Sequence, residues 1–249
     1  MKIKKILFGL ALVGLMAIPT TIFAQFEGQI TIKAYGETDG VPNTSELNLY
    51  STANRIIIKG DNSVSVMDGV DASGLLIRND KKDFIVMMGE KKALQFTKEE
   101  LEGFFQMAGM MSGEEDDVDV SVDTKFTYTN KTRKILGYDS TELLIENDEN
   151  ESSLSVWLTS GIDINWGMLA EPWKNVPESM KNSSARLTQE FKSKNFPMLI
   201  ELHEKGKTTT VMEVANVNKS SVAKAMVEVP AGVSLIGLQE MIFSMMMGN

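Results

Sequence analysis

Residues 75–96 of the chain, LLIRNDKKDFIVMMGEKKALQF, decide the fold. Apolar runs alternate here with polar segments at Asn79–Lys82 and Gly89–Lys92, which have the composition of tight turns. Apolar runs this short, bounded by turn residues, are typical of strands joined by hairpins. The stretch therefore predicts an antiparallel meander.

The same pattern extends in both directions along the chain. Residues 29–34 alternate polar and apolar side chains, as expected for a half-buried strand. Gly60-Asp61-Asn62 predicts a turn between two strands, and Lys205-Gly206 predicts a hairpin. The other expected strands are residues 47–50, 55–59, 64–67, 125–129, 141–146, 153–158, 198–203, 208–214 and 226–230.

Two segments change to the helical period. The first begins at Thr97, which forms a capping box with Glu100, and the second lies near the C-terminus. Their apolar faces consist of Leu101, Phe104, Phe105, Ala108 and Met111, and of Leu238, Met241, Ile242 and Met245. We therefore expect an α+β protein, mostly β, in which a few amphipathic helices cover an antiparallel sheet.

The N-terminus has the layout of a secretory signal peptide. Basic residues precede an apolar run from Ile6 to Ile18, and a cleavage region ends at Ala24. Gln25 follows where a lipid anchor would need a cysteine, so we expect residues 1–24 to be removed and the product to be periplasmic or secreted, without stable membrane insertion. No repeat or linker divides the remainder, and residues 25–249 are expected to form a single domain.

Charge excludes one class of partner. The whole chain carries a formal net charge of −9, and loss of the three lysines of the signal makes the mature chain −12. A protein this acidic is repelled by phosphate backbones. Nucleic acid is therefore not an expected partner.

Residue types argue against catalysis and against a metal or cofactor. The chain has no cysteine, and His203 is its only histidine, so neither a nucleophile–histidine arrangement nor a zinc site is expected. Acidic side chains alternate from Asp117 to Asp123, but this run lacks the glycine and bidentate glutamate of a calcium loop. We expect a protein that is not an enzyme.

Methionines are concentrated on the two helical segments. Methionine is flexible and polarizable, so it either fills gaps in a core or lines a surface that accepts varied apolar partners. The first alternative predicts ordinary packing, and the second predicts an apolar groove. The candidate ligand-binding residues are Phe104, Phe105, Met107, Met111, Met241 and Met245, with Trp157 as a further member.

Short motifs at strand ends resemble those of an exported Bacteroidota family that shares a domain of unknown function. They are Lys59-Gly60-Asp61, Met67-Asp68, Ile135-Leu136-Gly137-Tyr138, Trp157-Leu158-Thr159, Phe196-Pro197-Met198 and Val229-Pro230-Ala231-Gly232. Members often carry a cysteine shortly after the Gly-Tyr pair, where this chain has Asp139-Ser140, so no redox role carries over. The family is in turn similar to the periplasmic lipoprotein-carrier fold, which implies a curved, open half-barrel whose mouth is covered by helices.

Two functions from different classes follow from these observations. The first is an exported binding protein that holds a lipid, an acyl chain or a lipidated protein in an apolar groove between sheet and helices. The second is a structural or interaction protein of the cell envelope with a filled core and no small ligand. A structure whose sheet and helices leave no continuous apolar cavity would favour the second.

Overall fold

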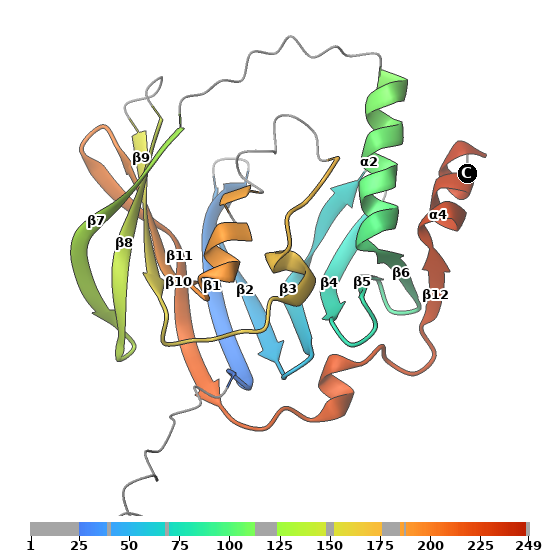
Figure 1. Cartoon of the computed structure of the whole chain (residues 1–249), viewed down its shortest axis with the longest axis horizontal. Coiled ribbons are helices and arrows are strands. Elements are labelled where there is room, and N and C mark those ends of the chain that lie inside the picture. Colours follow the sequence, from blue (N-terminus) through green and yellow to red (C-terminus); the bar gives the residue numbers. More distant parts are fainter. Residues whose placement is uncertain are drawn as a thin grey trace, which may run out of the picture.

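The computed structural model describes residues 25–38, 41–67, 70–112, 124–147, 152–175, 185–186 and 188–247, and the predicted signal peptide lies outside them. Within this part of the chain, twelve strands form one curved, open sheet in the order β12-β6-β5-β4-β3-β2-β1-β11-β10-β9-β8-β7 (Figure 1). Every neighbouring pair is antiparallel except β12 and β6. The predicted fold class is therefore confirmed.

The elements follow the expected order along the chain. The strands are β1 (Gly28–Thr38), β2 (Val41–Ser51), β3 (Arg55–Met67), β4 (Val70–Arg78), β5 (Asp83–Met88), β6 (Lys92–Thr97), β7 (Thr124–Ile135), β8 (Tyr138–Asn147), β9 (Ser152–Thr159), β10 (Phe196–Glu204), β11 (Lys207–Lys219) and β12 (Ser234–Gly237). The helices are α2 (Lys98–Ser112), η1 (Gly167–Ala170), η2 (Lys224–Val227) and α4 (Leu238–Met246).

Local signals account for several of these boundaries. The Thr97 backbone N–H donates to the Glu100 carboxylate at 2.7 Å, and the Glu100 N–H donates to the Thr97 hydroxyl at 3.1 Å, so the predicted capping box starts α2. Lys205 and Gly206 both have positive φ, at 50° and 76°, as a two-residue hairpin between β10 and β11 requires. Both predictions are confirmed.

Two sequence predictions were wrong. We expected a turn at residues 60–62, but β3 continues through them, and the irregularity is absorbed as a shift in its register with β4 between Lys59 and Val64. We expected a final strand at residues 226–230, but this segment begins with the end of η2, and the last strand is β12. In the second case Val227 is buried in an apolar cluster rather than paired in the sheet.

Strands β3 to β5 are apolar on both faces. Ile56, Ile77 and Phe84 point into the main core on the concave face, and the intervening Ile57, Leu76 and Ile85 form a second cluster on the convex face. Exposed apolar surface of this extent is unfavourable, so both faces of this half of the sheet need a cover.

The cover of the concave face includes α2, α4 and an inner strap, which we define as residues 160–175. Its residues Ile162, Ile164 and Trp166 are buried in the main core. Polar side chains hold it in place: Lys98 donates to the carbonyls of residues 171 and 172 at 3.1 and 2.9 Å, and Asn79 donates to the carbonyl of residue 165 at 3.0 Å. Because Lys98 belongs to α2, the helix and the strap are fastened to each other.

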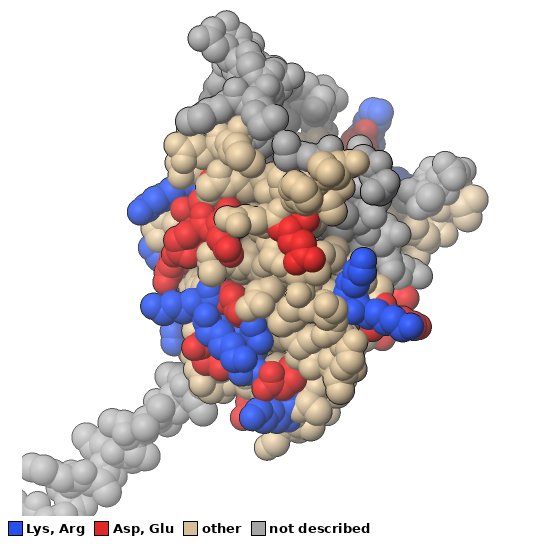
Figure 2. Space-filling view, turned by 90° about the vertical axis from the view of Figure 1, so that its right-hand side faces the viewer, with Lys and Arg blue, Asp and Glu red and all other residues tan. Residues whose placement is uncertain are grey.

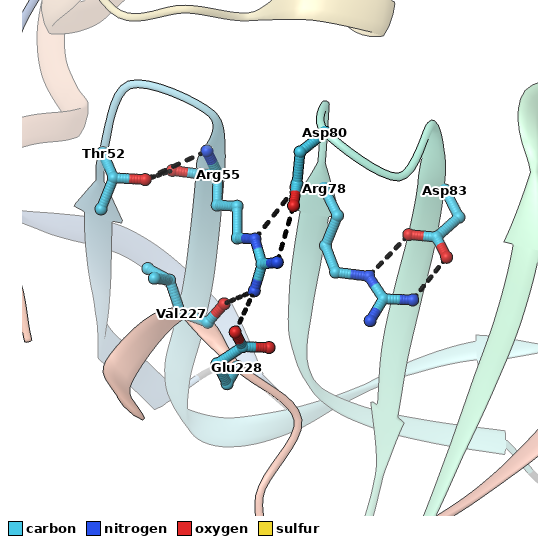
Figure 3. Close-up of polar contacts among 7 residues, drawn as sticks. All are labelled: Thr52, Arg55, Arg78, Asp80, Asp83, Val227 and Glu228. Carbon is cyan, nitrogen blue, oxygen red and sulfur yellow. Dashed lines mark hydrogen bonds and ion pairs between the residues drawn. The ribbon is translucent and has the colours of Figure 1, made fainter. Parts of the chain in front are cut away.

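The convex face is covered by an outer strap, residues 220–233, which runs from β11 to β12 (Figure 1). Val227 packs in the convex cluster, and Arg55 fixes the strap beside it. The Arg55 guanidinium donates to the Val227 carbonyl at 3.2 Å and pairs with Glu228 at 2.5 Å, while its other edge binds Asp80 at 2.7 and 3.0 Å (Figure 3). Hydrogen bonding to Arg55 lowers the pKa of both Asp80 and Glu228.

We predict that Arg55→Met detaches the outer strap and lowers the free energy of unfolding by about 2 kcal/mol, because the charge-assisted bonds are lost while the aliphatic stem is kept. Lys134→Met is the matched control: Lys134 and its partner Asp139 are 66% and 87% exposed, so about 0.5 kcal/mol or less is expected. Urea denaturation measures both. Equal effects of the two variants would contradict the assigned role of Arg55.

Acid should weaken the same contacts. The pKa values of Asp80 and Glu228 are lower in the folded than in the unfolded chain. At a pH between the folded-state and unfolded-state values the unfolded chain binds more protons, so the free energy of unfolding decreases as the pH is lowered through this range. We expect the stability difference between wild type and Arg55→Met to be constant from neutral pH to about pH 5 and to shrink below about pH 4. A difference that stays constant through this range would refute the linkage.

Candidate functional site

The concave face of β7 to β11 carries an apolar surface, which we call the concave strip. Cross-strand register defines its first row: Met212 lies opposite Ile200, Ile200 opposite Val156, and Val156 opposite Leu143. A second row runs beside it through Leu202, Leu154, Ile145 and Phe126. The strip consists of Phe126, Leu143, Ile145, Leu154, Val156, Ile200, Leu202 and Met212.

Register with β1 places the strip on the concave side. Directly opposed residues in an antiparallel pair lie on one face, and alternate residues along a strand share it. Val214, opposite Ile32, is buried in the main concave core, and Met212, opposite Ala34, follows on the same side. The strip is therefore continuous with the core.

Burial distinguishes the strip from that core. Leu143 is buried, but the other strip residues are only half-buried, and none belongs to either hydrophobic cluster. The helical residues 188–192 also lie on this side, because Phe191 stacks on Trp166 of the core at 4.5 Å between ring centroids. An apolar surface of this size that retains solvent contact is suited to an apolar ligand.

The convex face of the same strands is a polar network. The hydroxyls of Thr129 and Ser155 donate to the buried Glu142 carboxylate at 2.5 and 2.7 Å, and Lys131 pairs with it at 3.0 Å. Desolvation alone would raise the pKa of Glu142, but hydrogen bonds from Thr129, Ser155 and Lys131 outweigh it and lower the pKa. Glu142 is therefore ionised at neutral pH.

His203 joins this network through Ser155. Its Nε2 lies 2.7 Å from the Ser155 hydroxyl, and its Nδ1 lies 2.9 Å from the Thr208 hydroxyl. Because the Ser155 proton is already given to ionised Glu142, the serine oxygen accepts from His203 Nε2–H. In a catalytic triad the histidine lies between the serine and the carboxylate, whereas here Ser155 lies between His203 and Glu142, so these three residues do not have the arrangement of a triad.

Trp157 lies on this convex face, away from the helices. It is only 8% exposed, and its indole N–H donates to Glu201 at 2.9 Å. Arg133 stacks over its ring at 5.6 Å and pairs with Glu201 at 3.3 Å. The structure thus separates Trp157 from the other candidate residues of the sequence.

The candidates on α2 and α4 divide among three environments. Met241 is buried in the main core at 4% exposure, and Phe104 packs against that core with its ring 6.2 Å from that of the half-buried Phe105. Met107 is 43% exposed. The side chains of Met111 and Met245 lie outside the described part of the structure.

The outer surface of α4 and β12 is also apolar in part. Phe243 and Met247 are 63% and 65% exposed, and Leu235 of β12 is 40% exposed. Figure 2, which faces this side of the molecule, shows a wide uncharged surface bordered by basic and acidic side chains. This surface and the concave strip are separate features of the fold.

Sequence reasoning missed the concave strip. Leu154 and Val156 alternate with polar residues, which predicted a strand with one apolar face, but the same signal is expected for core-facing residues. One signal in the sequence could have indicated the strip: it predicts more strands with one apolar face than its few helices could cover. Which strands remain half-covered depends on the order of the sheet.

No described helix is long and apolar enough to cross a membrane. In the described residues, no group of three or more His, Cys, Asp or Glu side chains is arranged to hold a metal ion. The acidic run Asp117–Asp123, considered above as a calcium loop, lies outside them.

A comparison with protein families identifies one match. The model of the family described as "Domain of unknown function (DUF4412)" matches residues 26–233. The chain belongs to this family. This agrees with the family of unknown function inferred from the strand-end motifs, and no curated protein matches the DUF4412 chain.

Solved structures that resemble this DUF4412 protein do so distantly. An uncharacterized conserved protein from Thermus thermophilus matches at TM-score 0.41 and 8% identity, over 86% of this chain and 91% of its own. A LolA superfamily protein from Nitrosomonas europaea matches at 0.30 and 11%, over 83% and 92%. A DUF1329 family protein from Desulfovibrio piger matches at 0.30 and 11%, over 82% and 91%. Likeness at this level carries no information on function.

We predict that His203, as the neutral imidazole, is the Nε2–H tautomer. Since it is the only histidine, long-range ¹H–¹⁵N NMR of uniformly labelled protein reports it without ambiguity. Ser155→Ala should weaken the preference, because the acceptor for Nε2–H is lost while the Thr208 hydroxyl can still donate to Nδ1. A dominant Nδ1–H form in the wild type would contradict the assigned direction of these bonds.

Proposed function

We propose that this protein is an exported, non-enzymatic binding protein that holds an acyl chain of a lipid or of a lipidated protein on the concave strip. The observation that carries the proposal is the half-buried state of the strip beside a fully buried core. The predicted signal peptide supports an exported form, in the periplasm or outside the cell.

The dimensions of the strip suit an extended hydrocarbon. Its first row crosses β11, β10, β9 and β8, and Tyr128 of β7, which lies opposite Leu143 beside the strip, extends the row to a fifth strand. At the usual spacing between strands this row is about 19 Å long. That length accommodates a long acyl chain lying across the strands.

The energetics also favour a chain-like ligand over a small polar one. Each methylene removed from water contributes roughly 0.8 kcal/mol, so a chain of about ten methylenes can exceed the cost of association, which is estimated at about 4 kcal/mol or more. The strip supplies no charged side chain of its own, and Glu142, Glu146, Glu201 and His203 lie on the convex face of these strands. Binding without chemistry is the function that this arrangement supports.

The test uses neighbouring residues of β8 that face opposite sides of the sheet. Ile145 belongs to the strip, whereas Leu144 lies opposite Ser155 on the convex face, and both are half-buried. We expect Ile145→Ser to weaken displacement of an apolar dye by laurate about tenfold, and Leu144→Ser to change it less than about twofold. Thermal denaturation confirms that both variants fold.

Loss of affinity in Leu144→Ser equal to that in Ile145→Ser would show that the strip is not the site. No binding of laurate by the wild type, together with no lipid in native mass spectra of protein from its own cell envelope, would refute the proposed function.

A second candidate function is supported by the exposed apolar residues of α4 and β12. These residues would suit an interaction protein of the cell envelope, the alternative expected from the sequence. Phe243→Ser with Met247→Ser should leave laurate binding unchanged. If instead the wild type binds no laurate and these substitutions abolish self-association in light scattering, the second function holds.

A further inference from the structure

A polar cluster lies where the concave strip reaches the edge of the sheet. The guanidinium of Arg186 lies over the ring of Phe126, a strip residue, at 5.1 Å from its centroid, and over that of Tyr128 at 5.5 Å. Other cations of the described chain stack on rings outside the strip: Lys98 on Trp173, Arg133 on Trp157 and Lys219 on Tyr138. Arg186 is thus the cation placed at this end of the apolar surface.

Glu190 binds only some of the N–H donors of the Arg186 guanidinium. Arg186 Nη2 pairs with Glu190 at 2.9 Å, and Nη1 donates to the Gln189 side chain at 3.3 Å. The buried Nε has no hydrogen-bond partner in the described part of the chain. A guanidinium carries several N–H donors in a planar fork, so Arg186 has donors left for a further oxygen.

The partners of Glu190 hold it at this position. Its other oxygen accepts from the Tyr128 hydroxyl at 2.6 Å and from the Asn195 amide at 2.7 Å. Burial, then the hydrogen bond to Glu190, raises the pKa of Tyr128 to about 12, so the phenol stays a donor at neutral pH. The cluster therefore combines a partly used cation with a fixed carboxylate and aromatic walls.

We propose that Arg186 receives the anionic head group of an amphiphile whose chain lies on the concave strip. This inference rests on the proposed function and narrows it to ligands with one apolar chain and a negatively charged oxygen head, either a carboxylate or a phosphate. Arg186 is 19% exposed, so a head group can reach it from solvent while the chain follows Phe126 onto the strip.

The electrostatics of the pair predict opposite effects for its two members. Arg186 attracts an anionic head group, and Glu190, held 2.9 Å from it, repels the same head group. Arg186→Gln should therefore remove the preference for anions, and Glu190→Gln should increase it. A merely structural role of the pair would make both variants weaken binding of every ligand alike.

The experiment compares laurate, dodecyl phosphate and dodecanol by dye displacement at about pH 8 and low ionic strength. For wild type we expect both anions to bind about tenfold more tightly than dodecanol. In Arg186→Gln the anions should bind as weakly as dodecanol, whose affinity is unchanged. Arg133→Gln is the matched control, since Arg133 also stacks on a ring and pairs with a glutamate, but on the convex face.

The outcomes separate the two proposals. Equal affinities of wild type for the three ligands, or an equal loss for all three in Arg186→Gln, would overturn the role of Arg186 and leave acyl-chain binding in place. Binding of none of the three would overturn the proposed function and this inference with it. Preference for only one anion would identify carboxylate or phosphate as the head group.

Discussion

The apolar character of both faces of β3 to β5 is the constraint on which the rest of the structure depends. Ile56 and Ile77 on one side, and Ile57 and Leu76 on the other, cannot all be buried by a single layer of helices. The chain therefore crosses both faces. On the concave side the inner strap lies together with α2 and α4. On the convex side the outer strap leaves β11 and crosses the face to reach β12.

Polar side chains at strand ends hold these covers in place. Arg55 fastens the outer strap through Glu228 and the carbonyl of Val227, and Lys98 fastens the inner strap to the start of α2. Each of these cations is largely buried and binds several oxygens at once. Its interactions therefore stabilise the fold more than an isolated surface ion pair would. Apolar burial supplies the driving force, and these contacts select where each strap lies.

The two ends of the sheet differ because the covering segments are concentrated at one of them. At the β3–β6 end both faces are filled. At the β7–β11 end the convex face is a hydrogen-bonded network around Glu142 and Glu201, whereas the concave face is apolar and only half-buried. An apolar ligand on this face would complete the burial that the chain itself leaves unfinished.

The sequence predicts those parts of the structure that depend on neighbouring residues. Alternation predicted the strands, and Thr97 with Glu100 predicted the start of α2. The burial of Val227 could not be predicted locally, because the cluster that receives it comes from four strands, β3 to β6. The turn expected at residues 60–62 fails for a similar reason: β4 pairs with β3 on both sides of it.

The candidate site shows the same limit more strongly. Residues on α2 and α4 were chosen for their composition, yet Met241 serves the core, and Trp157 belongs to the opposite face of the sheet. The concave strip arises from register across five strands that extend from Thr124 to Lys219. Alternation shows that Leu154 and Val156 share a face, but only the sheet order shows that no core cluster includes them.

The most direct measurement of the central claim is a methyl NMR titration of Ile-, Leu- and Val-labelled protein with laurate. We predict that the methyl signals of Ile145, Leu154, Val156, Ile200 and Leu202 shift together and saturably, while those of Ile57, Leu76 and Ile85 in the convex cluster stay in place. Saturable shifts confined to Leu101 of α2 and to Leu238 and Ile242 of α4, or no shifts at all, would contradict this prediction.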